Sequence, residues 1–162
     1  MWKKSRVIKF FILITVVFAG VFVDDEIRDI QKEGRSIVEA GYYFFQHSRG
    51  TSEYLEDALD NQDNKEVFLD EVHRASTYIR GAKTWVNYLA FKYEDSRVDF
   101  TELKEYIDSV DVEELIEMDI NSPQNISKIS ELHQRFEQIG KIHEGYYKDP
   151  ENLNRTIQNL EL

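Results

Sequence analysis

The sequence predicts an all-α protein: a single N-terminal membrane-spanning or signal helix followed by an antiparallel helical bundle of three long and several short helices. Three observations support this fold class. Residues 7–23 are an almost unbroken apolar run, later apolar residues recur at alternating intervals of four and three, and no stretch alternates like a half-buried strand. We therefore expect a signal-anchor or transmembrane segment over residues 1–23 and one extracytoplasmic, acidic helical-bundle domain over residues 24–162.

The apolar run has the length and the flanks of a membrane anchor. As a helix, residues 7–23 would extend about 26 Å, which is close to the lower limit for crossing a bilayer core. Basic residues occupy its N-terminal side and acidic residues follow it: Lys3, Lys4, Arg6 and Lys9, then Asp24, Asp25 and Glu26. The positive-inside rule then predicts a single-pass protein of the cell membrane with a cytoplasmic N-terminus and its C-terminal domain outside.

Cleavage of the same segment is an alternative that the sequence leaves open. Val17 and Ala19 put small or branched residues at the −3 and −1 positions of a signal-peptide cleavage site. A chain cleaved near Ala19 would be a secreted, soluble helical binder or effector. We favour the retained anchor, because a helical stripe begins at Val23, the last residue of the apolar run, and no proline interrupts the continuation.

The acidic, cysteine-free composition narrows the classes of function. None of the 162 residues is cysteine, which excludes disulfides, a thiol nucleophile, a cysteine zinc site and a lipidated cysteine. The chain has 20 basic and 31 acidic residues, and leaving out the four basic residues at positions 3–9 gives 16 against 31, a charge of −15 for the rest. Such a surface repels nucleic acid and anionic lipid and favours cations or a basic protein partner.

Two stripes with alternating spacings of four and three predict the first long helices. The first stripe comprises Val23, Ile27, Ile30, Gly34, Ile37, Gly41 and Phe44. The second comprises Phe68, Val72, Ala75, Ile79, Ala82, Val86, Leu89 and Tyr93. If the two helices are antiparallel, the seven-residue spacing of their small residues predicts that Gly34 lies near Ala82 and Gly41 near Ala75.

Start signals place the remaining boundaries. Ser48, Arg49 and Gly50 predict a turn. Capping-box pairs occur at Asp63 and Glu66, at Asp99 and Glu102, and at Asp111 and Glu114, and cap–proline pairs occur at Ser122–Pro123 and Asp149–Pro150. The expected long helices span residues 24–47, 64–94 and 123–147, and the shorter ones span 51–60, 100–118 and 150–161.

One histidine and one acidic block are the candidates for chemistry. His143 occupies a core position of its predicted helix, where an imidazole can titrate or bind a metal, although a partly buried structural histidine is the commoner situation. The carboxylates of residues 94–119 form a candidate interaction surface for divalent cations or a basic protein: Asp99, Glu102, Glu105, Asp108, Asp111, Glu113, Glu114 and Glu117. The ordinary alternative is a solvated face of two short helices.

Four consecutive aromatic residues, Tyr42 to Phe45, exceed what one helical stripe requires. Two of them should face a second surface, either the helix at 51–60 or a ligand groove. No catalytic, phosphate-binding or calcium-binding motif is recognisable, so we expect no cofactor and no enzyme activity. The predicted function is that of a non-enzymatic, membrane-tethered, extracytoplasmic interaction module that acts through a protein partner. The alternatives are the secreted binder and a metal or enzyme site around His143.

Overall fold

The computed structural model describes residues 39–92, 98–118, 122–143 and 150–160, except for the side chains of His143 and Pro150. The chain divides into two units, Met1–Ser36 and Ile37–Leu162, and every described residue belongs to the second. Of the described residues 87% are helical and none is in a strand, which confirms the all-helical prediction for this part of the chain.

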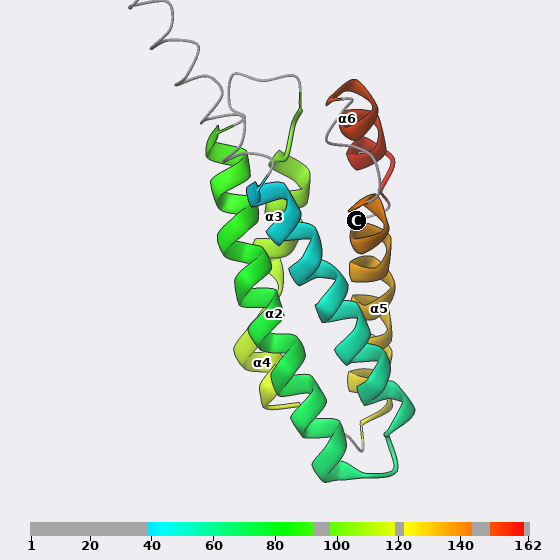
Figure 1. The fold of residues 1–162 in the computed structure, drawn as a ribbon. Helices are drawn as coiled ribbons and strands as arrows, with labels where there is room; N and C mark the ends of the chain where they lie inside the picture. Colours follow the sequence, from blue (N-terminus) through cyan, green and yellow to red (C-terminus); the bar gives the residue numbers. More distant parts are fainter. Residues whose placement is uncertain (1–38, 93–97, 119–121, 144–149, 161–162) are drawn as a thin grey trace, which may run out of the picture. The chain divides into compact units, whose positions relative to one another are not determined.

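The described elements follow one another as helices joined by short connections (Figure 1). The first helix covers residues 39–60 and is called helix 39–60 below. The others are α2 (Lys65–Lys92), α3 (Thr101–Ser109), α4 (Val112–Ile116), α5 (Pro123–Gly140), the 3₁₀ turn η1 (Lys141–His143) and α6 (Pro150–Gln158).

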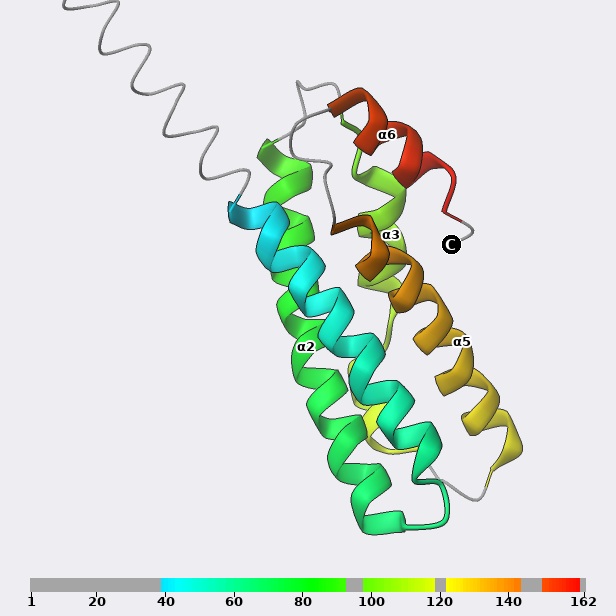
Figure 2. The same cartoon turned by 45° about the vertical axis from the view of Figure 1, so that its right-hand side comes forward.

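The described residues between 39 and 143 run up and down as a bundle of four legs (Figures 1 and 2). Helix 39–60 and α2 form an antiparallel hairpin joined by a turn at residues 61–64. The third leg is the pair α3 and α4, which pack against α2. The fourth leg is α5, which lies beside helix 39–60, and α6 lies across the end of the bundle where α5 ends. The predicted antiparallel helical bundle is thus confirmed for the described residues.

The core is built from the stripe that the sequence predicts for α2. Its members Phe68, Val72, Ala75, Ile79, Ala82, Val86 and Leu89 are all buried. Helix 39–60 adds Phe44, Phe45, Leu55 and Ala58, and α5 adds Ile129, Phe136 and Ile139. Burial of these apolar side chains is the main stabilising contribution to the domain.

The turn predicted at Ser48, Arg49 and Gly50 does not form, because the helix runs through it. Ser48 and Thr51 do not cap a new helix; their hydroxyls donate to the carbonyls of Phe44 and His47, four residues earlier. Gly50 lies where a Cβ would overlap the Tyr78 ring of α2. The missing side chain allows close packing that offsets glycine's unfavourable helix propensity of about 1 kcal/mol.

Some of the predicted helix starts are confirmed, and others begin at a different capping residue. Asp111 caps α4 as predicted, because its carboxylate accepts from the backbone N–H groups of Glu113 and Glu114. Ser122 and Pro123 begin α5 as predicted, although the Ser122 hydroxyl donates to Gln124 rather than capping the helix. Helix α2 begins at Lys65, and the side chain that accepts from its first turn belongs to Asn64 and not to Asp63.

Residues 100–118 form two short helices, α3 and α4, as the two start signals at Asp99 and Asp111 predict. The backbone is extended at Val110 and Asp111, between α3 and α4. At the start of α3 the Asp99 carboxylate accepts from the backbone N–H of Thr101, so Asp99 supports this end, but no reciprocal capping box with Glu102 is found. Both start signals thus lie at the beginnings of helices, although only Asp111 occupies the N-cap position itself.

The predicted pairing of Gly41 with Ala75 is wrong, whereas Gly34, the partner predicted for Ala82, lies outside the described residues. His47 lies against Gly81, Gly50 against Tyr78, and Tyr43 stacks on Trp85. This register places Gly41 level with the region of Asn87, about 18 Å along the helix axis from Ala75. The contacts that fix this register are made by large rings packed on glycine. Heptad spacing does not encode the register.

Several predictions lie outside the described residues. These are the anchor over residues 7–23, the N-terminal part of the helix predicted from residue 24, Gly34, and the helix ends at residues 93–94 and 144–147. In the described ranges no helix is both long enough and apolar enough to cross a bilayer.

Candidate functional site

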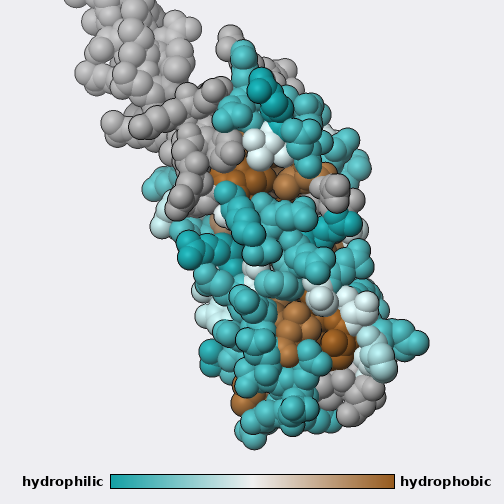
Figure 3. Space-filling view, turned by 90° about the vertical axis from the view of Figure 1, so that its right-hand side faces the viewer, coloured by the Kyte–Doolittle hydropathy of each residue, from teal (hydrophilic) through white to brown (hydrophobic). Residues whose placement is uncertain are grey.

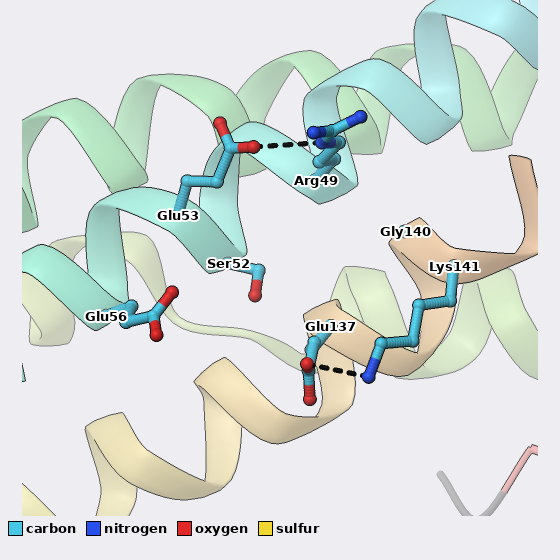
Figure 4. Close-up of a pocket in the computed structure, with 7 residues that line it drawn as sticks. All are labelled: Arg49, Ser52, Glu53, Glu56, Glu137, Gly140 and Lys141. Atoms are coloured by element: carbon cyan, nitrogen blue, oxygen red, sulfur yellow. Dashed lines mark hydrogen bonds and ion pairs between the residues drawn. The ribbon is translucent and has the colours of Figure 1, made fainter.

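A cavity lies between helix 39–60 and α5 (Figure 4). It has a volume of about 380 Å³ and is called the interhelical groove below. Its lining residues are Arg49, Ser52, Glu53, Glu56, Glu137, Gly140 and Lys141. None of these residues was singled out from the sequence as a site, because they come together only when the first and the last legs of the bundle pack.

Small residues let the two legs meet beside the groove. A Cβ on Gly140 would lie 3.1 Å from the Cα of Arg49, which is tighter than an ordinary contact and involves backbone on the other side. The Ser52 side chain is buried, and its hydroxyl lies 3.2 Å from Nδ1 of His133 in α5. The two helices are therefore held together beside the groove by a close backbone contact and by one partly buried polar pair.

Ser52 and His133 are residue types that can act as a nucleophile and its base, but their hydrogen bonds do not support these roles. The same Nδ1 lies 3.1 Å from the backbone carbonyl oxygen of Ser52. A carbonyl oxygen only accepts, so this hydrogen bond places the proton on Nδ1, and the nitrogen then has no lone pair with which to take a proton from the hydroxyl. The contact supports a structural role in joining helix 39–60 to α5.

The charged walls of the groove are largely neutralised within their own helices. Arg49 donates to Glu53 at 2.9 Å, and Lys141 pairs with Glu137 at 2.7 Å, as Figure 4 shows. The hydrogen bond from Lys141 lowers the pKa of Glu137, with smaller help from the charges of Lys141 and His133. Both pairs are well exposed, so each adds little to stability.

The eight carboxylates of the predicted acidic block are all exposed, and several of them bind other groups of the domain. Asp111 caps α4, and Asp99 accepts from Thr101. Glu113 pairs with Arg80 of α2, and Glu114 pairs with Lys128 of α5, both at 2.7 Å. Four of these carboxylates thus have partners within the domain, and the exposed ion pairs of Glu113 and Glu114 add little to its stability. Glu102, Glu105 and Glu117 are likewise exposed.

Asp108 connects two helices, although its side chain is 37% exposed. Its carboxylate accepts from Lys104 at 2.8 Å and from Asn87 of α2 at 3.2 Å. Partial burial alone would raise its pKa, but the hydrogen bonds and the nearby lysine charges outweigh burial, and the pKa is lowered. This aspartate therefore also joins α3 to α2.

The predicted histidine site lies largely outside the described atoms. His143 ends η1, and its side chain is not described. His73 is exposed on α2, where its backbone carbonyl accepts from Ser76 and Thr77. Within residues 39–92, 98–118, 122–142 and 151–160, no three histidine, aspartate or glutamate side chains are grouped to hold a metal ion.

The four consecutive aromatic residues divide evenly between core and surface. Phe44 and Phe45 are buried, whereas Tyr42 is 44% and Tyr43 41% exposed. The two tyrosines do not pack on a separate helix at 51–60, because those residues continue their own helix. Tyr43 instead stacks on Trp85 of α2, with ring centroids 5.0 Å apart.

These rings belong to a group of aromatic residues at the end of the hairpin where helix 39–60 begins and α2 ends. Tyr42 contacts Tyr43, and Trp85 contacts Tyr88 edge to face at 6.4 Å. Phe91 follows one turn later and is 71% exposed. The aromatic surface is defined below as Tyr42, Tyr43, Trp85, Tyr88 and Phe91.

The opposite part of the bundle has a different surface. On the side of α5 and α6, hydrophilic side chains predominate and hydrophobic ones gather in two separate areas (Figure 3). Half-buried apolar residues on or beside these helices include Ile126, Leu132 and Leu160.

Comparison with protein-family models, curated proteins and solved structures finds no match to this chain.

Proposed function

We propose that the protein is a non-enzymatic, membrane-tethered, extracytoplasmic interaction module whose helical domain binds a protein partner through the aromatic surface. The supporting observation is the exposure of Phe91 and of the Tyr43 ring on the same end of one helical hairpin. Large aromatic side chains are enriched at protein interfaces, since they bury much area with few rotatable bonds.

The proposed anchor is the apolar run at residues 7–23. Its basic N-terminal flank and acidic C-terminal flank support a cytoplasmic N-terminus and a domain outside the membrane. The net negative charge of the rest of the chain favours a partner with basic groups around an apolar contact, through steering during association.

The proposed anchoring is tested by fractionating cells that produce the full chain and measuring the intact mass of the product. A full-length species in the membrane fraction is expected. A species that begins at Gly20 and appears in the medium would contradict the anchor and establish the secreted alternative.

The proposed surface is tested with matched variants of α2. Phe91→Ser removes the most exposed ring, and Val67→Ser removes a half-buried apolar side chain at the other end of the same helix. Proteins crosslinked to the tethered domain in intact membranes should be lost with F91S and retained with V67S. Equal crosslinking by both variants, at equal abundance and helix content, would exclude the aromatic surface as the contact.

A further inference from the structure

We propose that His47 makes the contact between helix 39–60 and α2 sensitive to acid, so that protonation of this one side chain opens the hairpin at the level of Gly81. The proposal concerns the conformation of the domain and does not depend on the proposed function. It follows from where the imidazole lies and from which ring nitrogen must receive the proton.

The imidazole of His47 occupies the space of an absent side chain. A Cβ built on Gly81 would overlap Nδ1, Cε1 and Cγ of the ring. The ring also meets Tyr78 edge to face, with centroids 5.3 Å apart. His47 is therefore half-buried, with its ring packed against the α2 backbone and the Tyr78 phenol.

Nδ1 is buried and has no hydrogen-bond partner among the described residues. A neutral imidazole tolerates this arrangement by carrying its single hydrogen on Nε2 and leaving Nδ1 as a bare acceptor. An imidazolium carries a hydrogen on both nitrogens. Protonation would thus create a buried N–H donor that faces a helix backbone whose carbonyl groups are already used, an unfavourable change.

The surroundings offer no compensating negative charge in the described part of the chain. The titratable group that faces the ring from α2 is Tyr78. The Tyr78 ring in turn packs against that of Tyr54 in helix 39–60, with ring centroids 5.1 Å apart. Arg74 lies over the far ring, Tyr54, and pairs with Asp70 and Glu71. Burial accordingly lowers the pKa of His47 below its ordinary 6.5.

Opening at this level would reach the aromatic surface. Tyr43 precedes His47 by about one helical turn, and Trp85 follows Gly81 by about one turn. Their stacked rings lie 5.0 Å apart across the same helix pair. Separation of the helices at His47 should therefore loosen the Tyr43–Trp85 stack, which makes Trp85 a reporter of the switch.

The test uses the full chain in detergent with Trp2→Phe, so that Trp85 is the single tryptophan. Trp85 fluorescence and the His47 ring resonances are followed between pH 7.5 and 4.5. A reversible fluorescence transition with its midpoint below pH 6.5 is expected, together with titration of His47 over the same range. His47→Gln should abolish the transition, and the matched variant His73→Gln, which changes an exposed histidine of α2, should leave it unchanged.

Two results would overturn the proposal. One is a His47 resonance that titrates at or above pH 6.5 while Trp85 fluorescence stays constant. The other is a transition that persists in H47Q with helix content equal to that of the parent at pH 7.5. If H47Q does not fold, the parent chain decides the matter, because a Trp85 transition that does not coincide with the His47 titration overturns the proposal.

Discussion

Lys83 of α2 closes the C-terminal end of α3, because its ammonium donates to the carbonyl oxygen of Val110 at 2.7 Å. The same group donates to the carbonyl of Asp108 at 3.1 Å. The last carbonyls of a helix lack partners within the helix and carry partial negative charge, so a cation at this place satisfies both needs. One side chain thereby joins the second leg of the bundle to the third.

Replacement of Lys83 by methionine should destabilise the domain by about 1–2 kcal/mol, since hydrogen bonds from a charged donor are lost while the apolar stem is kept. Thermal unfolding followed by circular dichroism measures the change. Lys128→Met is the matched control, because its ion pair with Glu114 is about half exposed and should contribute at most about 1 kcal/mol. Equal losses in both variants would contradict the capping role.

Gly81→Ala should destabilise the hairpin by about 1–3 kcal/mol, because the new methyl group overlaps the His47 ring. The gain in helix propensity of about 1 kcal/mol offsets part of this cost. In a His47→Ala background the overlap disappears, and the same substitution should become neutral or stabilising. A double-mutant cycle measures the difference, and strictly additive effects would show that the two residues do not meet.

The burial of Tyr106 leads us to expect a loss of stability at alkaline pH. Burial raises its pKa to about 12, from an ordinary value of 10.0, with smaller opposing effects of Arg135 and Glu131. A raised folded-state pKa contributes stability that is complete below pH 10 and is lost as the pH rises from 10 to 12. Denaturant unfolding at pH 9 and pH 11 should show a smaller loss for Tyr106→Phe than for the parent chain.

The acidic block yields a prediction that separates structural from surface carboxylates. Asp111→Ala should cost about 1 kcal/mol, because two backbone N–H groups of α4 lose their acceptor. Glu105→Gln changes an exposed carboxylate of α3 and should alter stability by at most about 0.5 kcal/mol. Urea unfolding of the two variants gives the comparison, and a larger effect of E105Q would mean that the roles are reversed.

Local spacing explains which predictions succeeded. The buried face of α2 could be predicted from Phe68 to Leu89, since a helix fixes which residues share a face whatever packs against it. The cap at Asp111 and the start at Ser122–Pro123 are likewise short-range effects of residues a few positions apart.

The failures concern contacts between distant residues. Gly50 signals a turn when only its neighbours are taken into account, yet the helix continues because Tyr78 packs where a Cβ would be. The interhelical groove is lined by residues of helix 39–60 and of α5, and Ser52 of this groove contacts His133, which is 81 positions away. No spacing rule connects such positions, so the candidate site could not be found from the sequence.

The sequence by itself determined the helical class, the buried face of α2, several helix starts, the negative charge and the proposal of an anchor at residues 7–23. These follow from short-range sterics, periodicity and composition. Only the tertiary structure decided the stagger of helix 39–60 against α2, the burial of Nδ1 of His47 against Gly81 and the internal use of the acidic block. The physical reason is that the stagger depends on how particular rings fill the spaces left by particular glycines, and those pairs form only when distant segments pack together.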